Sequence, residues 1–377
     1  MNNMPKTSKA AVLREYNKPL EICDVKIPSL NEGDMLVSVL LSGICGTDKN
    51  EYMGLLADKV YAGLPIIPGH EALGRVEKIG GNVDLLDATG NRVKIGDRIL
   101  WSHMFCHKCF TCTILGEPSK CIAAYSHGYG FGSVEELHGG YSEYEIVLKD
   151  TDFIIVPEEL EDEEVLGVAC AFRSSMHGYM RLLEVGGVKP GDSVVVQGCG
   201  PIGLYALVCL AQTAASRIIV IGAPAVRLEL AREWGATDII DIDEIPDPEA
   251  RHRMIMELTG GKGANVIVEA SGFTSSFVEG CNFAAVFAKY LVLGIGIQPT
   301  SFQSAVLCDK NMTIVGSGGA DIKHYYYALE FIKAYRHKYP FAKMVSNTYR
   351  IEQANEALDA MFKGTNIKPT FDNRIKL

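Results

Sequence analysis

The sequence has no long apolar run and no excess of basic charge. Its 377 residues contain no apolar stretch of the roughly 20 residues that a membrane-spanning helix needs, so we expect no membrane partner. Acidic residues outnumber basic ones, 46 to 36, and the formal net charge is −10. Binding to nucleic acid needs clustered lysine and arginine to contact phosphates, so we expect no nucleic-acid partner.

The sequence also lacks internal repeats, low-complexity linkers and, in Met1–Lys9, the apolar core of a secretion signal. Hydrophobic residues make up 47% of the chain and charged residues 22%, as in ordinary globular proteins, and the length suggests two domains. We expect a cytoplasmic protein. In that setting the eleven cysteines favour metal ligands and buried thiols over disulfides.

The pattern of apolar and turn residues changes about halfway along the chain. Up to about residue 165 short apolar or alternating runs are separated by turn residues, which predicts strands, and residues 165–183 are apolar at helical spacing. From Ser193 onward strands alternate with helices, which predicts βαβ units, a parallel sheet and an α/β fold. The predicted strands are Met35–Leu41, Gly74–Ile79, Tyr144–Val147, Ser193–Gln197, Arg217–Ile221, Asp238–Asp241, Asn265–Glu269 and Tyr290–Gly294, and the predicted helices include Ile202–Ala214, Arg227–Trp234, Pro248–Thr259, Ser275–Ala288, His324–Tyr335 and Ile351–Lys363.

Four cysteines lie within sixteen residues: Cys106, Cys109, Cys112 and Cys121. Such spacing lets short loops bring four sulfurs to a tetrahedral zinc ion. Four thiolates leave no open coordination position, so this would be a structural zinc site and not a catalytic one.

A glycine fingerprint follows the predicted strand Ser193–Gln197 and opens a helix. It comprises Gly198, Gly200 and Gly203, with Pro201 and Ile202 between the last two. In a βαβ unit such glycines permit a tight turn, close approach to a pyrophosphate and close packing of helix on strand. The sequence therefore predicts a dinucleotide cofactor, NAD(P); a glycine-rich turn without ligand is the alternative.

The second strand of the unit ends at Gly222, where an acid that binds the adenosine ribose is expected. Without that carboxylate nothing repels a 2′-phosphate, and Arg227 follows five residues later. NADP is thus slightly favoured over NAD. Arg227 could instead be a solvated helix residue.

Three further residues suggest a second zinc site. Cys45, His70 and Cys170 offer two thiolates and one imidazole, which leaves the open fourth position of a catalytic zinc. Spacing alone cannot bring such scattered residues together, and either cysteine could be a buried structural thiol.

The motifs occur in a characteristic order: residues 45–48 (CGTD), 68–71 (PGHE), 94–98 (KIGDR), the four cysteines and the glycine fingerprint. In this order the chain resembles a zinc-containing medium-chain alcohol dehydrogenase over nearly its whole length. The resemblance implies a GroES-like β-barrel catalytic domain over 1–171 with a structural zinc lobe at 101–125. It also implies a Rossmann NAD(P)-binding domain over 172–310 and a segment 311–377 that returns to the catalytic domain.

The resemblance also assigns roles. Cys45, His70 and Cys170 would hold the catalytic zinc, so the chain would bind two zinc ions. Thr47 would receive the proton of the alcohol, Asp48 would orient the histidine ligand, and Glu71 would lie just behind the metal. Lys368 would pair with the cofactor pyrophosphate.

Two features depart from the family pattern. Asn50 stands where many members have a histidine that passes the proton to solvent, and asparagine has no titrating proton near neutral pH. Eight residues, instead of the usual seven, separate Cys112 from Cys121.

We therefore expect a hydride-transferring alcohol dehydrogenase acting on a small alcohol or carbonyl substrate, as a homodimer or homotetramer. The segments 121–130 and 139–144 resemble a family branch that includes dehydrogenases of secondary metabolism, which favours a secondary or cyclic alcohol. A polyol or sugar-alcohol dehydrogenase is one alternative, and a non-catalytic cofactor-binding sensor or scaffold is another.

Overall fold

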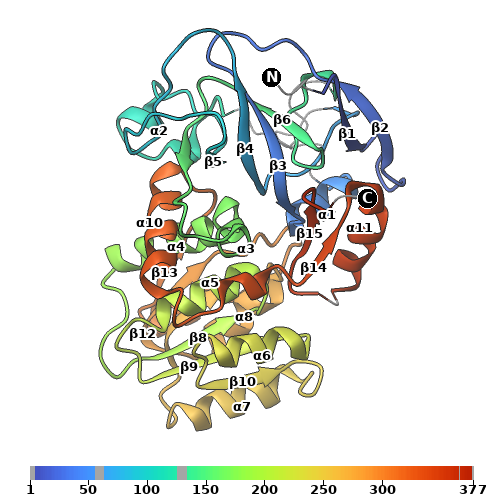
Figure 1. Cartoon of the computed structure of the whole chain (residues 1–377). Coiled ribbons are helices and arrows are strands. Elements are labelled where there is room, and N and C mark those ends of the chain that lie inside the picture. Colours follow the sequence, from blue (N-terminus) through green and yellow to red (C-terminus); the bar gives the residue numbers. More distant parts are fainter. Residues whose placement is uncertain (1–4, 56–62, 125–133, 365, 376–377) are drawn as a thin grey trace. The chain divides into compact units, whose positions relative to one another are not determined.

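The computed structural model describes residues 5–55, 63–124, 134–364 and 366–375, and it divides into two units (Figure 1). The first unit comprises residues 1–170 and 320–377, and the second comprises residues 171–319. The second unit thus continues past the predicted boundary at 310, because a further strand after that point joins its sheet. Among the described residues, no helix has the length and apolar character needed to cross a membrane.

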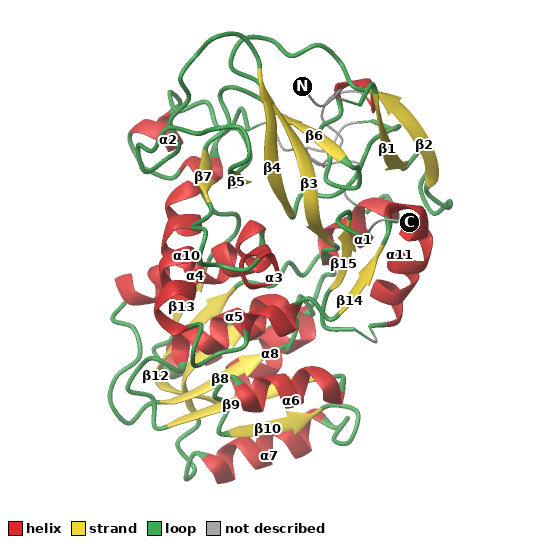
Figure 2. Cartoon of the chain, in the orientation of Figure 1, coloured by secondary structure: helices red, strands yellow, loops and turns green. Residues whose placement is uncertain are grey.

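The first unit is built on a seven-stranded, mainly antiparallel sheet in the order β14-β15-β3-β4-β5-β7, with β6 also paired to β3 (Figure 2). The C-terminal strand β15 pairs with β3, near the start of the chain, so the two ends of the sequence share one sheet. The seven strands of this sheet are β3 (Met35–Gly43), β4 (Ala72–Ile79), β5 (Arg98–Trp101), β6 (Tyr144–Val147), β7 (Phe153–Ile155), β14 (Asn347–Tyr349) and β15 (Pro369–Asp372). Strands β1 (Thr7–Val12) and β2 (Glu21–Lys26) form a separate two-stranded sheet.

Helices of the first unit are mostly short. The two longest are α10 (Ile322–Tyr335) and α11 (Ala354–Lys363). The others are α1 (Gly46–Tyr52), α2 (Phe110–Thr113), α3 (Asp162–Val165) and the 3-10 turns Pro118–Lys120, Val134–Glu136, Leu166–Ala169 (η3), Phe341–Met344 and Ile351–Gln353.

Two hydrophobic clusters stabilise the first unit. One packs the alternate residues Met35, Val37 and Val39 of β3 against Trp101 of β5 and its neighbours. The other surrounds Tyr141. Both clusters lie where strands from distant parts of the chain meet, so burial of apolar surface fixes the positions of the loops that follow β3 and precede β4.

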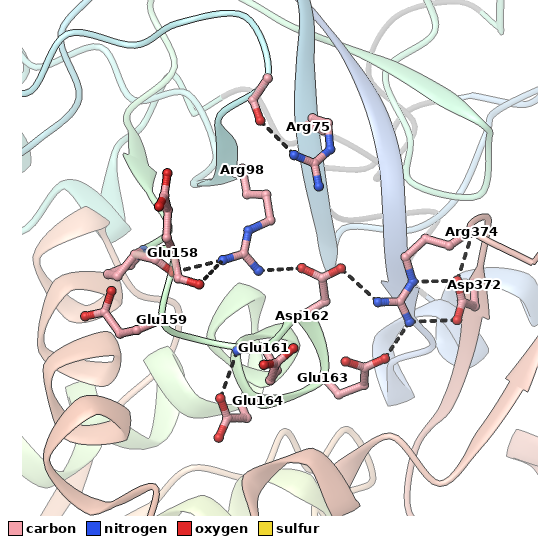
Figure 3. A network of polar contacts seen from close by, with 12 residues as sticks. Arg75, Arg98, Glu158, Glu159, Glu161, Asp162, Glu163, Glu164, Asp372 and Arg374 are labelled. Carbon is pink, nitrogen blue, oxygen red and sulfur yellow. Dashed lines mark hydrogen bonds and ion pairs between the residues drawn. The ribbon is translucent and has the colours of Figure 1, made fainter.

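An ion-pair network ties the C-terminal return to the first unit (Figure 3). The Asp162 carboxylate at the start of α3 accepts hydrogen bonds from Arg98 of β5 at 2.6 Å and from Arg374, just after β15, at 2.8 Å. Arg374 also pairs with Asp372 and Glu163. Asp162 thus joins two basic side chains from distant parts of the sequence.

The second unit holds a six-stranded parallel sheet in the order β10-β9-β8-β11-β12-β13. This is the order of a doubly wound dinucleotide-binding sheet, and it confirms the predicted α/β class. The strands are β8 (Ser193–Gln197), β9 (Arg217–Gly222), β10 (Asp238–Asp241), β11 (Ala264–Glu269), β12 (Ala284–Val292) and β13 (Thr313–Gly316), and the helices are α4 (Ala171–Glu184), α5 (Pro201–Leu210), α6 (Ala225–Glu233), α7 (Pro248–Leu258), α8 (Thr274–Phe283) and α9 (Ala305–Asp309).

Three stretches predicted as helical were wrong in extent, and one of them, 202–214, ends at Leu210. The run 165–183 is no single helix: α3 and η3 precede an irregular residue, Cys170, at φ −147° and ψ −68°, and only then does α4 begin. Residues 165–172 are all buried, so the apolar pattern gave no sign of the break. The predicted helix 275–288 ends at Phe283, and β12 starts at the next residue.

Candidate metal and cofactor sites

Three separate loops of the first unit bring thiol, imidazole and carboxylate groups together. Cys45 begins α1, His70 and Glu71 immediately precede β4, and Cys170 lies between η3 and α4. One ligand atom from each of these four residues lies within 4.8 Å of the other three. The structure therefore brings together the three residues that the resemblance assigned to a catalytic metal, with Glu71 beside them.

Burial and mutual contact strongly perturb the ionisable groups of this cluster. A hydrogen bond with Cys170, and then burial, raise the pKa of the Cys45 thiol well above its usual range. Burial lowers the pKa of His70, but Asp48 and Cys45 outweigh it and raise that pKa to about 10. A divalent cation would stabilise the thiolate form of the cysteines and the neutral form of the imidazole, so the donor set fits a zinc ion.

Lys368 lies at the same cluster and not on the surface. Its Nζ forms an ion pair with Glu71 Oε2, and the two residues are 2% and 1% exposed. Burial lowers the pKa of Lys368, but Glu71, Cys45 and Cys170 raise it to about 12. Lys368 is thus the counter-ion of Glu71, a contact that the sequence did not predict.

Asp48 joins the proposed ligand His70 to the backbone of the preceding loop. Its Oδ1 lies 3.0 Å from His70 Nδ1, and its Oδ2 accepts hydrogen bonds from the Cys45 amide and the Tyr141 hydroxyl, both at 2.8 Å. The contact with His70 is the geometry expected of a carboxylate that orients a histidine ligand. Tyr141 was not predicted as a site residue; the only signal was its place in a segment, 139–144, that resembles the family.

The proposed proton relay lies on α1. Thr47 and Asn50 are partly buried, and Thr47 Oγ1 lies 3.7 Å from Cys45 Sγ. Glu51, four residues after Thr47 and thus on the same side of the helix, is only 4% exposed. Burial, and then the nearby Asp48 charge, raise the pKa of Glu51 to about 8. Sequence inspection missed this residue.

The four sulfurs of Cys106, Cys109, Cys112 and Cys121 also lie within 4.8 Å of one another. Cys109 Sγ is 3.4 Å from Cys112 Sγ, and the Cys121 sulfur accepts from the Cys106 and Ala123 amides at 3.4 Å. A hydrogen bond from Thr111, and then one from the Cys112 amide, lower the pKa of Cys109 to about 5. A structural zinc site needs four converging sulfurs and amide groups that donate hydrogen bonds to them. The extra residue before Cys121 does not prevent the four sulfurs from converging. Residue 125, the predicted end of the lobe, lies outside the described residues, as do residues 126–130 of the segment used above for the family branch.

The glycine fingerprint has the geometry of a phosphate-binding turn. Gly198 has a positive φ of 99°, and a side chain at Gly203 would begin 1.8 Å from the Gly198 carbonyl oxygen. A Cβ on Gly200, in contrast, would meet nothing within 4 Å. Pro201 and Ile202 begin α5. The turn thus packs tightly on one side and leaves the second glycine open to a pyrophosphate at the helix N-terminus.

Close packing is a second reason why residue 222 is a glycine and not an acid. A Cβ at this position would lie 2.4 Å from the sulfur of Cys199, which occupies the second position of the fingerprint. The absence of an acid at 222 therefore does not by itself indicate NADP. Burial lowers the pKa of the partly buried Arg227, and the interaction with Cys199 opposes this, so the guanidinium lies near the fingerprint turn.

Comparisons with known proteins point to one family. Residues 31–158 match the family described as alcohol dehydrogenase GroES-like domain, and residues 201–334 match the zinc-binding dehydrogenase family. The 5-exo-hydroxycamphor dehydrogenase of Pseudomonas putida is 34% identical over 98% of this chain and 99% of its own length. D-arabinitol dehydrogenase 1 of Uromyces fabae is 29% identical over 92% of each chain.

A solved structure has the same fold over its full length. An alcohol dehydrogenase from Thermotoga maritima aligns with a TM-score of 0.88 and 29% identity, over 97% of this chain and 99% of that one. The GroES-like and Rossmann folds predicted from the sequence are thereby confirmed. The chain belongs to the zinc-containing alcohol dehydrogenases of the medium-chain dehydrogenase/reductase superfamily.

Proposed function

We propose that this enzyme transfers a hydride between a secondary or cyclic alcohol and NAD(P), using one zinc ion held by Cys45, His70 and Cys170. A second zinc, held by the four cysteines of the lobe, would be structural. The observation that carries the proposal is the buried convergence of two thiols, an imidazole and Glu71 within 4.8 Å. A non-catalytic sensor or scaffold would have no need to retain this ligand set.

When bound, a zinc ion at this site supplies Lewis-acid chemistry, which lowers the pKa of an alcohol toward neutrality. The chain's own residues do the rest. Asp48 holds the imidazole of His70, and Lys368 balances the charge of Glu71. Thr47 Oγ1 accepts the proton of the alcohol and passes it on, while Asn50 cannot be the terminal base. Hydride transfer itself is chemistry of the nicotinamide.

The proposed substrate class, a secondary or cyclic alcohol, is inferred from the names of similar enzymes. A hydroxycamphor is a cyclic secondary alcohol, and the dehydrogenase named for it is similar over nearly the whole chain. The similarity to an arabinitol dehydrogenase keeps a polyol or sugar alcohol as the alternative. The same site can run in the reverse direction as a carbonyl reductase.

The purified enzyme is expected to oxidise cyclic secondary alcohols with at least about tenfold higher kcat/KM than open-chain polyols, because the relative that is similar over nearly the whole chain is named for a cyclic secondary alcohol. The measurement is initial-rate kinetics with matched primary, secondary, cyclic and polyhydric alcohols, each with NAD and with NADP. Preferred turnover of polyols would replace the main proposal with its alternative, and no turnover of any alcohol by zinc-loaded enzyme would contradict both.

We further propose that NAD(P) binds at the Gly198–Gly203 turn and that Arg227 favours NADP over NAD. Arg227→Ala is expected to raise KM for NADP by about 10- to 100-fold and KM for NAD much less, since a charged hydrogen bond contributes about 1.5–3 kcal/mol. Arg232→Ala, on the exposed side of the same helix, is the matched control. Equal effects on both cofactors, or a wild-type enzyme that strongly prefers NAD, would contradict this assignment.

Assembly into a homodimer or homotetramer is also proposed. Strand β13 lies at an edge of the six-stranded sheet, and its Ile314 is 39% exposed. An open edge strand with an exposed apolar side chain is suited to pairing with another copy. A cytoplasmic location is proposed because all eleven cysteines are free thiols.

A further inference from the structure

Both oxygens of the Asp48 carboxylate are engaged, and only one of them contacts the proposed metal ligand. Oδ1 faces His70 Nδ1 at 3.0 Å. Oδ2 accepts from the Cys45 amide and from the Tyr141 hydroxyl, each at 2.8 Å. The amide restrains one end of the carboxylate from the α1 side, and the hydroxyl restrains it from a loop almost a hundred residues away in sequence. Rotation of the carboxylate would break all three contacts together.

Tyr141 itself is held rigidly. Its side chain is fully buried, and its ring lies 4.7 Å from the ring of Phe371 in an edge contact. Its amide donates to the Pro68 carbonyl at 2.9 Å. Burial, and then the Asp48 charge, raise the pKa of the phenol well above its usual range, so the hydroxyl stays protonated and acts as a donor.

The ring of Tyr141 also determines the turn that carries His70. Gly69 has a positive φ of 95°, and a Cβ there would lie 2.3 Å from Tyr141 Cδ1. The Gly140 amide donates to the Gly69 carbonyl at 2.9 Å. The turn 68–70 is thus packed directly on the tyrosine ring, and His70 leaves it at one fixed angle.

We propose that Tyr141 is a positioning residue for the metal ligand His70, acting through two parts of one side chain. The hydroxyl fixes Asp48, which fixes the imidazole, and the ring fixes the backbone turn from which His70 projects. This inference rests on the proposed function and deepens it. Removing a partner of a group that orients a metal ligand typically costs 10- to 100-fold in metal affinity or activity.

The test is zinc release from the purified holoenzyme. Tyr141→Phe keeps the ring and deletes only the hydroxyl, and it is expected to release the catalytic zinc to excess chelator at least about tenfold faster than wild type. The structural zinc should leave at an unchanged rate. In protein loaded with Co²⁺, the visible absorption bands of the catalytic site should shift, because His70 is less well oriented. Tyr144→Phe, in the same segment but at the start of β6 and near the charges of Glu77 and Glu143, is the matched control and should behave as wild type.

A second pair of variants separates positioning from general destabilisation. If the hydroxyl acts through Asp48, Tyr141→Phe should have no further effect on zinc release in an Asp48→Asn background. Phe371→Leu, which leaves the hydroxyl and Asp48 in place but removes the contact with the ring, should also speed release, and it serves as the test if Tyr141→Phe does not fold.

Unchanged zinc release and an unchanged Co²⁺ spectrum in Tyr141→Phe would overturn the role of the hydroxyl, and unchanged release in Phe371→Leu would overturn that of the ring. A full effect of Tyr141→Phe in the Asp48→Asn background would overturn the route through Asp48. If wild-type enzyme binds only the structural zinc, it is the proposed function that fails, and the two failures are therefore distinguishable.

Discussion

Replacing Cys170 by serine is expected to lower kcat/KM by about a thousandfold or more and to remove one of two zinc ions per chain. A serine hydroxyl is not deprotonated near neutral pH, so it cannot replace the thiolate in a three-ligand zinc site. The metal is expected to contribute several kcal/mol to stabilisation of the developing negative charge, and about 4 kcal/mol corresponds to a thousandfold in rate. Since serine is close to cysteine in size, the substitution leaves no large cavity at the buried position 170, and the fold should survive.

Metal analysis and steady-state kinetics on the same preparations provide the measurement. Cys112→Ser, in the four-cysteine cluster, is the matched control. It should lose the other zinc ion and lower the unfolding temperature while the remaining folded enzyme keeps most of its kcat. Retention of both metal ions and of full activity in Cys170→Ser would show that the catalytic assignment is wrong.

The free energy of unfolding of the wild-type enzyme is expected to fall as the pH rises from about 5 to 8, and Glu51→Gln is expected to abolish the part of this fall that is due to Glu51. Glu51 has a pKa raised to about 8 in the folded protein by burial and then by Asp48, against 4.5 when unperturbed. Between these values the folded state binds a proton that the unfolded state has released. The free energy of unfolding therefore falls with rising pH, by at most about 1.4 kcal/mol per pH unit for this one proton.

Glutamine has nearly the same shape and does not titrate. The measurement is the free energy of unfolding from urea titrations at pH 5, 6, 7, 8 and 9 for both proteins. The difference in favour of Glu51→Gln should grow up to about pH 8 and level off above it. Glu229→Gln, at an exposed position in the second unit, should show no such slope. A pH-independent difference for Glu51→Gln would mean that Glu51 is ionised throughout this range.

Regions held together by contacts between residues close in sequence were predicted better than regions held together by contacts between distant residues. The first two strands after residue 192, β8 and β9, were predicted to within one residue, because each has its own apolar pattern and its own turn. The four-cysteine cluster could be predicted from spacing, since its ligands are held by local loops. The run 165–183 around Cys170 has helical apolar spacing, and its uniform burial hides the break on which the position of Cys170 depends.

Contacts between distant segments could not be predicted from the spacing of residues in the sequence. Cys45, His70 and Cys170 became a site only through the family resemblance, since no periodicity relates them. The same limit explains why Tyr141 and Glu51 were missed and why Lys368 was expected at the cofactor and not beside Glu71. Gly222 shows a different limit. The absence of an acid there could reflect either a preference for NADP or close packing, and the packing against Cys199 is visible only in the structure.

The insertion of β15 between β14 and β3 has a consequence for the order of events during protein synthesis. The second unit is one continuous stretch, residues 171–319, so all of its strands have been synthesised while the last 58 residues of the first unit, 320–377, are still to be made. Strand β3 can pair with β4 and β6 early, but it cannot gain β15 until residue 372 is translated, and Glu71 cannot gain Lys368 until shortly before that. Domains generally fold as units once their residues are available. The dinucleotide-binding unit can therefore be complete first, and a nascent chain stopped before residue 368 would carry that finished unit while the cluster around Glu71 still lacks its counter-ion.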